Sequence, residues 1–152
     1  GKGSQKQRNV AVLAESTPLE DINTGTTSKH CRYFKMQVLN SHKSDSINEL
    51  FVNSIKDSSI VFTDKSTSYV DIADYVEVHV SEVSNNITTN TTLKWVHIAI
   101  ANAKRMLLGI YHKIKGAYLQ NYLNEFCYKL NRRYFGERCF DRLTLAVAKI
   151  YW

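Results

Sequence analysis

The chain has 152 residues, of which 43% are hydrophobic, and this length suffices for one domain with a sizeable core. No apolar run approaches the roughly 20 residues that a bilayer-spanning helix needs, and the basic start GKGSQKQRNV has no signal-like stretch behind it, so we expect a cytoplasmic protein with no membrane partner. The three cysteines form no C-x-x-C pair, which favours reduced, mostly buried thiols over a disulfide framework or a zinc knuckle.

Charge is divided unevenly along the chain. Residues 1–92 carry 9 Lys/Arg and 11 Asp/Glu, a net charge of −2, whereas residues 93–152 carry 11 and 3, a net charge of +8. A basic half of this kind is typical of a surface that binds a polyanion, most often nucleic acid. A merely solvated basic face is the alternative.

The first half of the chain alternates β-type runs with Ser/Thr/Asn/Gly-rich connectors. The runs cover 9–14, 31–39, 59–64 and 75–80, and the polar segments 16–29 and 84–92 are expected to be loops. Between the second and third runs, the spacing of the apolar residues predicts a helix over 46–55, with Asp45 or Ser46 as its N-cap.

The second half predicts three helices, over about 92–108, 116–130 and 137–150, with Gly109, Gly116 and Gly136 at the breaks. The last two helices have core-facing stripes at helical spacing, formed by Leu119, Tyr122, Leu123, Phe126 and Leu130, and by Phe140, Leu143, Val147 and Ile150. Strands, a helix, further strands and a helical run together indicate an α/β fold with a mixed sheet.

Asp64 closes the apolar run at 60–62. Its carboxylate should therefore emerge at the carboxyl end of a buried strand, where open α/β sheets usually place their sites. The alternative is that Asp64 caps a helical turn within the following segment KSTSYVDIA.

In the helix expected over 92–108, His97 and Lys104 lie seven residues apart. Seven residues make nearly two turns, so both side chains project from almost the same face, about 10.5 Å apart along the axis. A partly buried histidine beside an exposed lysine is the alternative to a functional pair.

Three stretches resemble the catalytic domain of ISXO-type insertion-sequence transposases, which belong to the DDE superfamily. VFTDKSTSY (61–69) is similar to a strand that ends in T-D with a tyrosine five residues later. NTTLKWVHIAIANAKRMLLGIYHKI (90–114) is similar to a helix with an acidic or polar position seven before a lysine, followed by G-x-Y-H. YLQNYLNEFCYKLNRRYF (118–135) is similar to the Y-L-x-E-F-x-x-x-x-N-R-R helix, and the similarity runs in register from about residue 8 to 148.

The resemblance implies a ribonuclease H-like mixed sheet flanked by helices, with a C-terminal helical run. It also implies DNA strand cleavage and transfer at insertion-sequence ends with two Mg²⁺ or Mn²⁺ ions, since hard cations prefer carboxylates. Asp64 then corresponds to the second acid of the triad and binds metal, and Lys104 to the helix lysine near the scissile phosphate. His97 occupies the third ligand position, where relatives have glutamate or asparagine; it is either a metal ligand that favours Mn²⁺ over Mg²⁺ or a group that orients phosphate.

DNA contacts are expected from the basic half of the chain and its aromatic residues, with the protein acting as a homo-oligomer in a synaptic complex. For each lysine the alternative is a solvated surface charge, and for the aromatic residues a place in the core. The DNA-binding candidates are Lys94, Lys104, Arg105, Tyr111, His112, Lys113, Arg132 and Arg133.

The family's first aspartate belongs to a D-E-x-[YF]-x-G-G stretch that this sequence lacks. Residues 1–152 are therefore expected to form one transposase catalytic domain that is incomplete at its N-terminus, with the first catalytic strand missing. Two alternatives stay open: a catalytically inactive DNA-binding remnant, and a basic domain that binds an acidic protein.

Overall fold

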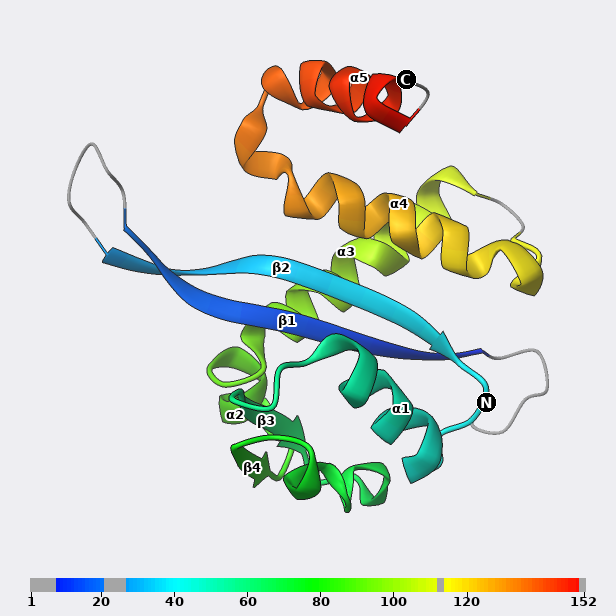
Figure 1. The fold of residues 1–152 in the computed structure, drawn as a ribbon. Helices are drawn as coiled ribbons and strands as arrows, with labels where there is room; N and C mark the ends of the chain where they lie inside the picture. The colour runs from blue at the N-terminus through cyan, green and yellow to red at the C-terminus, as the bar shows by residue number, and fades with distance from the viewer. Residues whose placement is uncertain (1–7, 21–26, 112–113, 151–152) are drawn as a thin grey trace.

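The computed structural model describes residues 8–20, 27–111 and 114–150. The fold is α/β, with four strands and five α-helices in these residues (Figure 1). They are β1 (Asn9–Glu20), β2 (Thr27–Leu39), α1 (Ser44–Ser54), β3 (Ile60–Asp64), β4 (Val78–Glu82), α2 (Asn86–Asn90), α3 (Lys94–Ile110), α4 (Leu119–Asn131) and α5 (Arg138–Ile150). Short 3₁₀ turns occupy Thr67–Tyr69, Ile72–Asp74, Gly116–Tyr118 and Arg133–Phe135.

Every strand and helix expected from the sequence is present, with shifted ends. β1 and β2 extend into the polar segment expected to be a loop, and α2 forms within the second one. The fourth strand begins at Val78 rather than at residue 75, because the 3₁₀ turn over Ile72–Asp74 is followed by a turn and bend over residues 75–77. The break expected at Gly109 comes slightly later: α3 includes Gly109 and ends at Ile110, since one glycine near a helix end costs only about 1 kcal/mol.

The antiparallel β1–β2 hairpin is the centre of the packing, and helices cover both of its faces (Figure 1). On one face, Phe34 and Met36 are buried against Ala99 of α3 and Phe126 of α4. On the other face, Ala11 and Leu13 pack against a cluster of buried side chains from α1 and the segment after β3, namely Ile47, Leu50, Phe51, Ile72 and Val76. Burial on both faces explains why the NVAVLA run is apolar throughout rather than alternating.

A β-bulge at Arg32 sets which β2 side chains enter the core. Tyr33 pairs with Glu15 and Cys31 with Ser16, so Arg32 has no partner on β1. The extra residue shifts the alternation of the strand, and Cys31 therefore joins the same buried cluster as Phe34 although they are three residues apart.

The described residues do not by themselves form the single mixed sheet expected from the sequence. They form two two-stranded sheets, the antiparallel β1–β2 hairpin and the parallel pair β3–β4. Side-chain packing around α1, which also takes in Val61 of β3, joins the two sheets instead of a backbone ladder. One edge of β1 and one edge of β3 thus have no strand partner among these residues.

Two side-chain amides of α4 close the outer edge of β2. The backbone N–H of Phe34 donates to Asn131 Oδ1 (2.7 Å), and Asn131 Nδ2 donates to the Phe34 carbonyl (2.9 Å). Gln120 repeats this arrangement further along, accepting from the Val38 N–H (2.7 Å) and donating to the Met36 carbonyl (2.9 Å). An edge strand exposes unpaired backbone groups, and α4 satisfies them here with amides.

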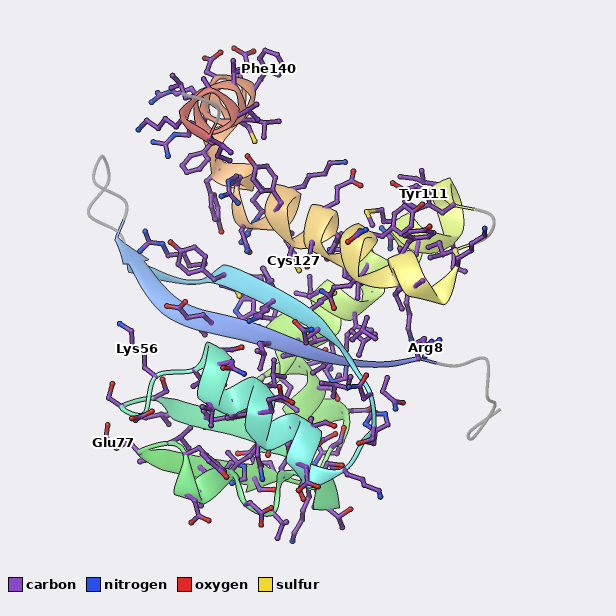
Figure 2. The ribbon with its side chains drawn as sticks, turned by 45° about the vertical axis from the view of Figure 1, so that its right-hand side comes forward. Arg8, Lys56, Glu77, Tyr111, Cys127 and Phe140 are labelled. Atoms are coloured by element: carbon purple, nitrogen blue, oxygen red, sulfur yellow. The ribbon has the colours of Figure 1, made fainter. Side chains whose placement is uncertain are left out.

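Two further expectations fail. α1 begins at Ser44 with Lys43 as its N-cap, two or three residues before the cap expected, and without a side-chain capping hydrogen bond. The apolar stripe of α5 is not part of a core: no residue of α5 is buried, and Phe140 and Ile150 are 74% and 79% exposed. Helical spacing predicted the stripe correctly but could not show whether another element reaches it; Figure 2 shows Phe140 on α5 well clear of the strands.

The cysteines are free thiols, as expected, with Cys31 and Cys127 buried and Cys139 half-buried. None of the described helices combines the length and the apolar character that crossing a membrane requires.

Candidate active site

Asp64 is the last residue of β3, and its side chain is exposed at the carboxyl end of the strand. Its register partner on the parallel strand β4 is Glu82, also the last residue of its strand. Register partners in a parallel pair point to the same face, so the structure brings two carboxylates to one edge of the sheet. Beside Asp64 lies a shallow, open hollow of about 300 Å³ lined by Asp64, Lys65, Ser66, Val83 and Ser84.

The turn after β3 leaves the Asp64 carboxylate available. Ser66, not Asp64, caps the following 3₁₀ turn, accepting from the Ser68 N–H (3.4 Å). Tyr69 in that turn lies near the site: burial, and then the negative charge of Asp64, raise the pKa of its hydroxyl. The capping role considered for Asp64 therefore belongs to Ser66.

A hydrogen bond joins the end of β4 to the segment that leads into α3. The Thr92 hydroxyl donates to Glu82 Oε2 (3.0 Å), two residues before α3 begins. Between them, α2 is held by a capping box in which Asn85 accepts from the Ile87 and Thr88 N–H groups. These contacts position the first turn of α3 relative to the carboxyl end of β4.

His97 and Lys104 are both exposed, on the face of α3 opposite Ala99 and Ala103, which are buried against the hairpin. The exposure of His97 argues against a core histidine. Among the residues that the structure describes, no hydrogen bond or ion pair joins His97 to Asp64, and no three His, Cys, Asp or Glu side chains are grouped to hold a metal ion. Their shared metal site stays a prediction.

The remaining DNA-binding candidates on and beside α3 differ in environment. Lys94 and Arg105 are exposed, and the Lys94 ammonium lies 5.7 Å from the Trp95 ring centroid. Tyr111 is half-buried: its ring lies 4.3 Å from that of Tyr122, and its hydroxyl donates to Glu125 (3.4 Å). Both His112 and Lys113 lie outside the described residues.

Arg132 and Arg133, adjacent in sequence, have different surroundings. Arg133 donates to the carbonyls of Leu130 and Cys31 (both 2.7 Å) and to the Tyr134 hydroxyl (2.6 Å), so its guanidinium joins the end of α4 to β2. Both guanidiniums lie over aromatic rings, Arg133 Cζ 4.2 Å from the Tyr134 centroid and Arg132 Cζ 3.8 Å from the Tyr128 centroid, but Arg132 forms no such hydrogen bonds with the residues that the structure describes.

Sequence reasoning missed Glu82. The available signal was the run VHVSE, which ends in an acid just as IVFTD does. Only the register of β3 and β4 shows that the two acids are partners.

The donor set fits part of a site for a hard divalent cation. Asp64 and Glu82 offer carboxylate oxygens, the ligands that Mg²⁺ and Mn²⁺ prefer. One Glu82 oxygen, however, already accepts from Thr92. The described residues thus supply Asp64 as an available carboxylate and leave the ligand set incomplete.

A comparison with family models identifies the chain. The model described as the ISXO2-like transposase domain matches residues 1–131. The chain belongs to this family. The part matched to the ISXO2-like transposase domain contains Asp64, His97 and Lys104, and it ends at Asn131, before Arg132 and all of α5. No curated protein and no solved structure matches the chain.

Proposed function

We propose that this ISXO2-like transposase domain takes part in metal-dependent DNA strand cleavage and strand transfer at the ends of an insertion sequence. The observation that carries the proposal is the exposed Asp64 carboxylate beside an open hollow at the carboxyl end of parallel strands. In open α/β sheets this is where ligands bind. The family supports the same reaction class, because it is a family of transposases.

In this proposal Asp64 would bind Mg²⁺ or Mn²⁺, which when bound activates an attacking hydroxyl or water and stabilises charge on the leaving oxygen. His97 contributes either a further ligand or a hydrogen bond to the scissile phosphate. Lys104 contributes a fixed positive charge that holds a DNA phosphate on the same face of α3. DNA and a second copy of the protein in a synaptic complex are the proposed partners.

A further aspartate would complete the site. The free edges of β1 and β3 can accept another strand by backbone hydrogen bonding, and such a strand would join the two sheets into one ribonuclease H-like mixed sheet. An aspartate on that strand would lie next to the end of β3.

The test is nicking of a duplex that carries the insertion-sequence end, by the intact protein, with Mg²⁺, with Mn²⁺ and with chelator. Asp64→Asn should abolish metal-dependent nicking and leave DNA affinity nearly unchanged. Asp57→Asn is the matched control, because Asp57 is also exposed but lies before β3, in the segment leading into it. Nicking that survives Asp64→Asn would refute the proposed role.

The same experiment separates the other two candidate functions. DNA binding without nicking by the wild-type protein in any metal would leave an inactive DNA-binding domain. Binding to duplex DNA that hardly changes with salt concentration would argue against a phosphate-contacting surface and for a domain that binds an acidic protein.

A further inference from the structure

We infer that Arg132 and Arg142 form a second DNA-backbone contact, separate from Asp64, and this inference rests on the proposed function. Arg132 follows α4 and Arg142 lies in α5. Figure 1 shows α5 and the β3–β4 pair at opposite ends of the molecule, and Figure 2 shows the same separation between Phe140 and Glu77. Both arginines lie beyond the residues that the family model matches.

The junction of α4 and α5 is strongly basic. Residues 128–149 contain six Lys/Arg and two Asp/Glu, a net charge of +4. Lys129 is neutralised by an ion pair with Glu125. Neither Arg132 nor Arg142 forms a hydrogen bond through its guanidinium or an ion pair with any residue that the structure describes, so both charges are available to a ligand.

Each of the two guanidiniums lies over an aromatic ring. Arg132 Cζ lies 3.8 Å from the Tyr128 centroid, and Arg142 Cζ lies 4.1 Å from the Phe135 centroid. Stacking orients a guanidinium through its face and leaves the N–H donors at its edge for hydrogen bonds. A phosphate group accepts two such donors at once. Because stacking already restricts the arginine side chain, less conformational freedom is lost when it binds the phosphate.

The turn between the helices brings these stacks together. The Phe135 N–H donates to the Arg132 carbonyl (2.9 Å), which links the two pairs in one 3₁₀ turn. Gly136 then reverses the chain with φ = +53°, a conformation that side-chain-bearing residues rarely adopt, and α5 returns Arg142 to Phe135. The two cationic stacks are therefore built by the fold of the junction.

Arg133 does not belong to this contact. Its donors are directed to the carbonyls of Leu130 and Cys31 and to Tyr134, within the protein. The adjacent arginines of the N-R-R motif thus separate into one that contacts DNA and one that holds α4 against β2. Contacts of stacked arginines to phosphate carry affinity without sequence preference, which suits duplex DNA away from the cleaved bond.

The test measures the salt dependence of binding to a labelled random-sequence duplex by fluorescence anisotropy. Replacing both arginines (Arg132→Gln with Arg142→Gln) should make the negative slope of log affinity against log salt shallower by about two, since each phosphate contact contributes about 0.9 to its magnitude. Arg132→Lys with Arg142→Lys keeps both charges and should keep the slope while weakening binding severalfold. Lys43→Gln with Lys56→Gln removes two exposed charges at the ends of α1 and should leave the affinity and the salt slope unchanged.

An unchanged slope in the double glutamine variant, or an equal fall in the Lys43 and Lys56 control, would overturn the inference. So would binding to anionic phosphatidylserine vesicles that the glutamine variant loses while its DNA binding is intact, because the partner would then be a membrane. Thermal unfolding of each variant shows whether it is folded. If the glutamine variant is not folded, the lysine variant tests the inference instead, because its binding should be severalfold weaker than that of the wild type.

The two proposals fail separately. If the wild-type protein never nicks DNA but the arginine pair sets the salt slope, the cleavage proposal fails and the contact stands. If Asp64→Asn abolishes nicking but the salt slope does not change when the two arginines are replaced, the contact fails and the cleavage proposal stands.

Discussion

Asn131 acts as a strand partner for Phe34. Its side-chain amide accepts from the Phe34 N–H and donates to the Phe34 carbonyl, the two hydrogen bonds that a neighbouring strand would make with the same residue. The two residues are 97 positions apart in sequence. The asparagine of the N-R-R motif therefore has a structural role at the edge of β2, beside Arg133, which bonds the carbonyl of Cys31 on the same strand.

Removing the Asn131 amide should destabilise the domain. Asn131→Ala would leave the N–H and the carbonyl of Phe34 without partners at a part-buried edge, and we expect the free energy of unfolding to fall by about 2 kcal/mol. Urea denaturation followed by circular dichroism measures the change. Asn121→Ala is the matched control, because Asn121 is an exposed asparagine of the same helix. Equal stability of the two variants would show that water replaces the amide at no cost.

Cys31 should make stability fall at alkaline pH. Burial raises the pKa of its thiol from 9.0 to about 11, with the nearby Arg133 opposing the shift and Glu15 adding to it. Because the unfolded chain loses the thiol proton first, the contribution is complete below pH 9 and is lost as the pH rises toward about 11. Denaturation across this window should show a smaller decline for Cys31→Ala than for the wild type.

Cys139→Ala serves as the control for that measurement, because Cys139 is only half-buried. Its pH profile should follow the wild type. A Cys31→Ala profile parallel to the wild type over the same window would mean that other groups cause the decline.

Glu82 should act by positioning α3 rather than as a charge at the site. Glu82→Gln retains an oxygen that accepts from Thr92, so metal-dependent nicking should stay within about twofold of the wild type. Glu82→Ala loses the hydrogen bond between β4 and the approach of α3, and the rate should fall by about tenfold, which corresponds to about 1.4 kcal/mol. Single-turnover nicking at saturating DNA compares the two. A glutamine variant as impaired as the alanine variant would instead make the Glu82 carboxylate a metal ligand.

The sequence by itself determined the local structure and the family. Alternating and helical spacing of apolar residues predicted four strands and four of the five helices, because these patterns depend on neighbours within a few turns. The motifs around Asp64, His97 and Lys104 indicated the transposase family that the comparison then showed. The spacing of seven residues also predicted correctly that His97 and Lys104 share one face of α3.

Tertiary structure alone decided what each of these elements contacts. The pairing of Asp64 with Glu82, the separation into two sheets and the exposure of α5 depend on strand register and helix placement, which no local pattern contains. The different roles of Arg132 and Arg133 have the same origin: the Arg133 guanidinium reaches a carbonyl 102 residues away, and the Arg132 guanidinium lies over the ring of Tyr128, in the last turn of the preceding helix. Long-range contacts are set when the chain buries its apolar surface as a whole, so identical neighbouring side chains acquire different partners.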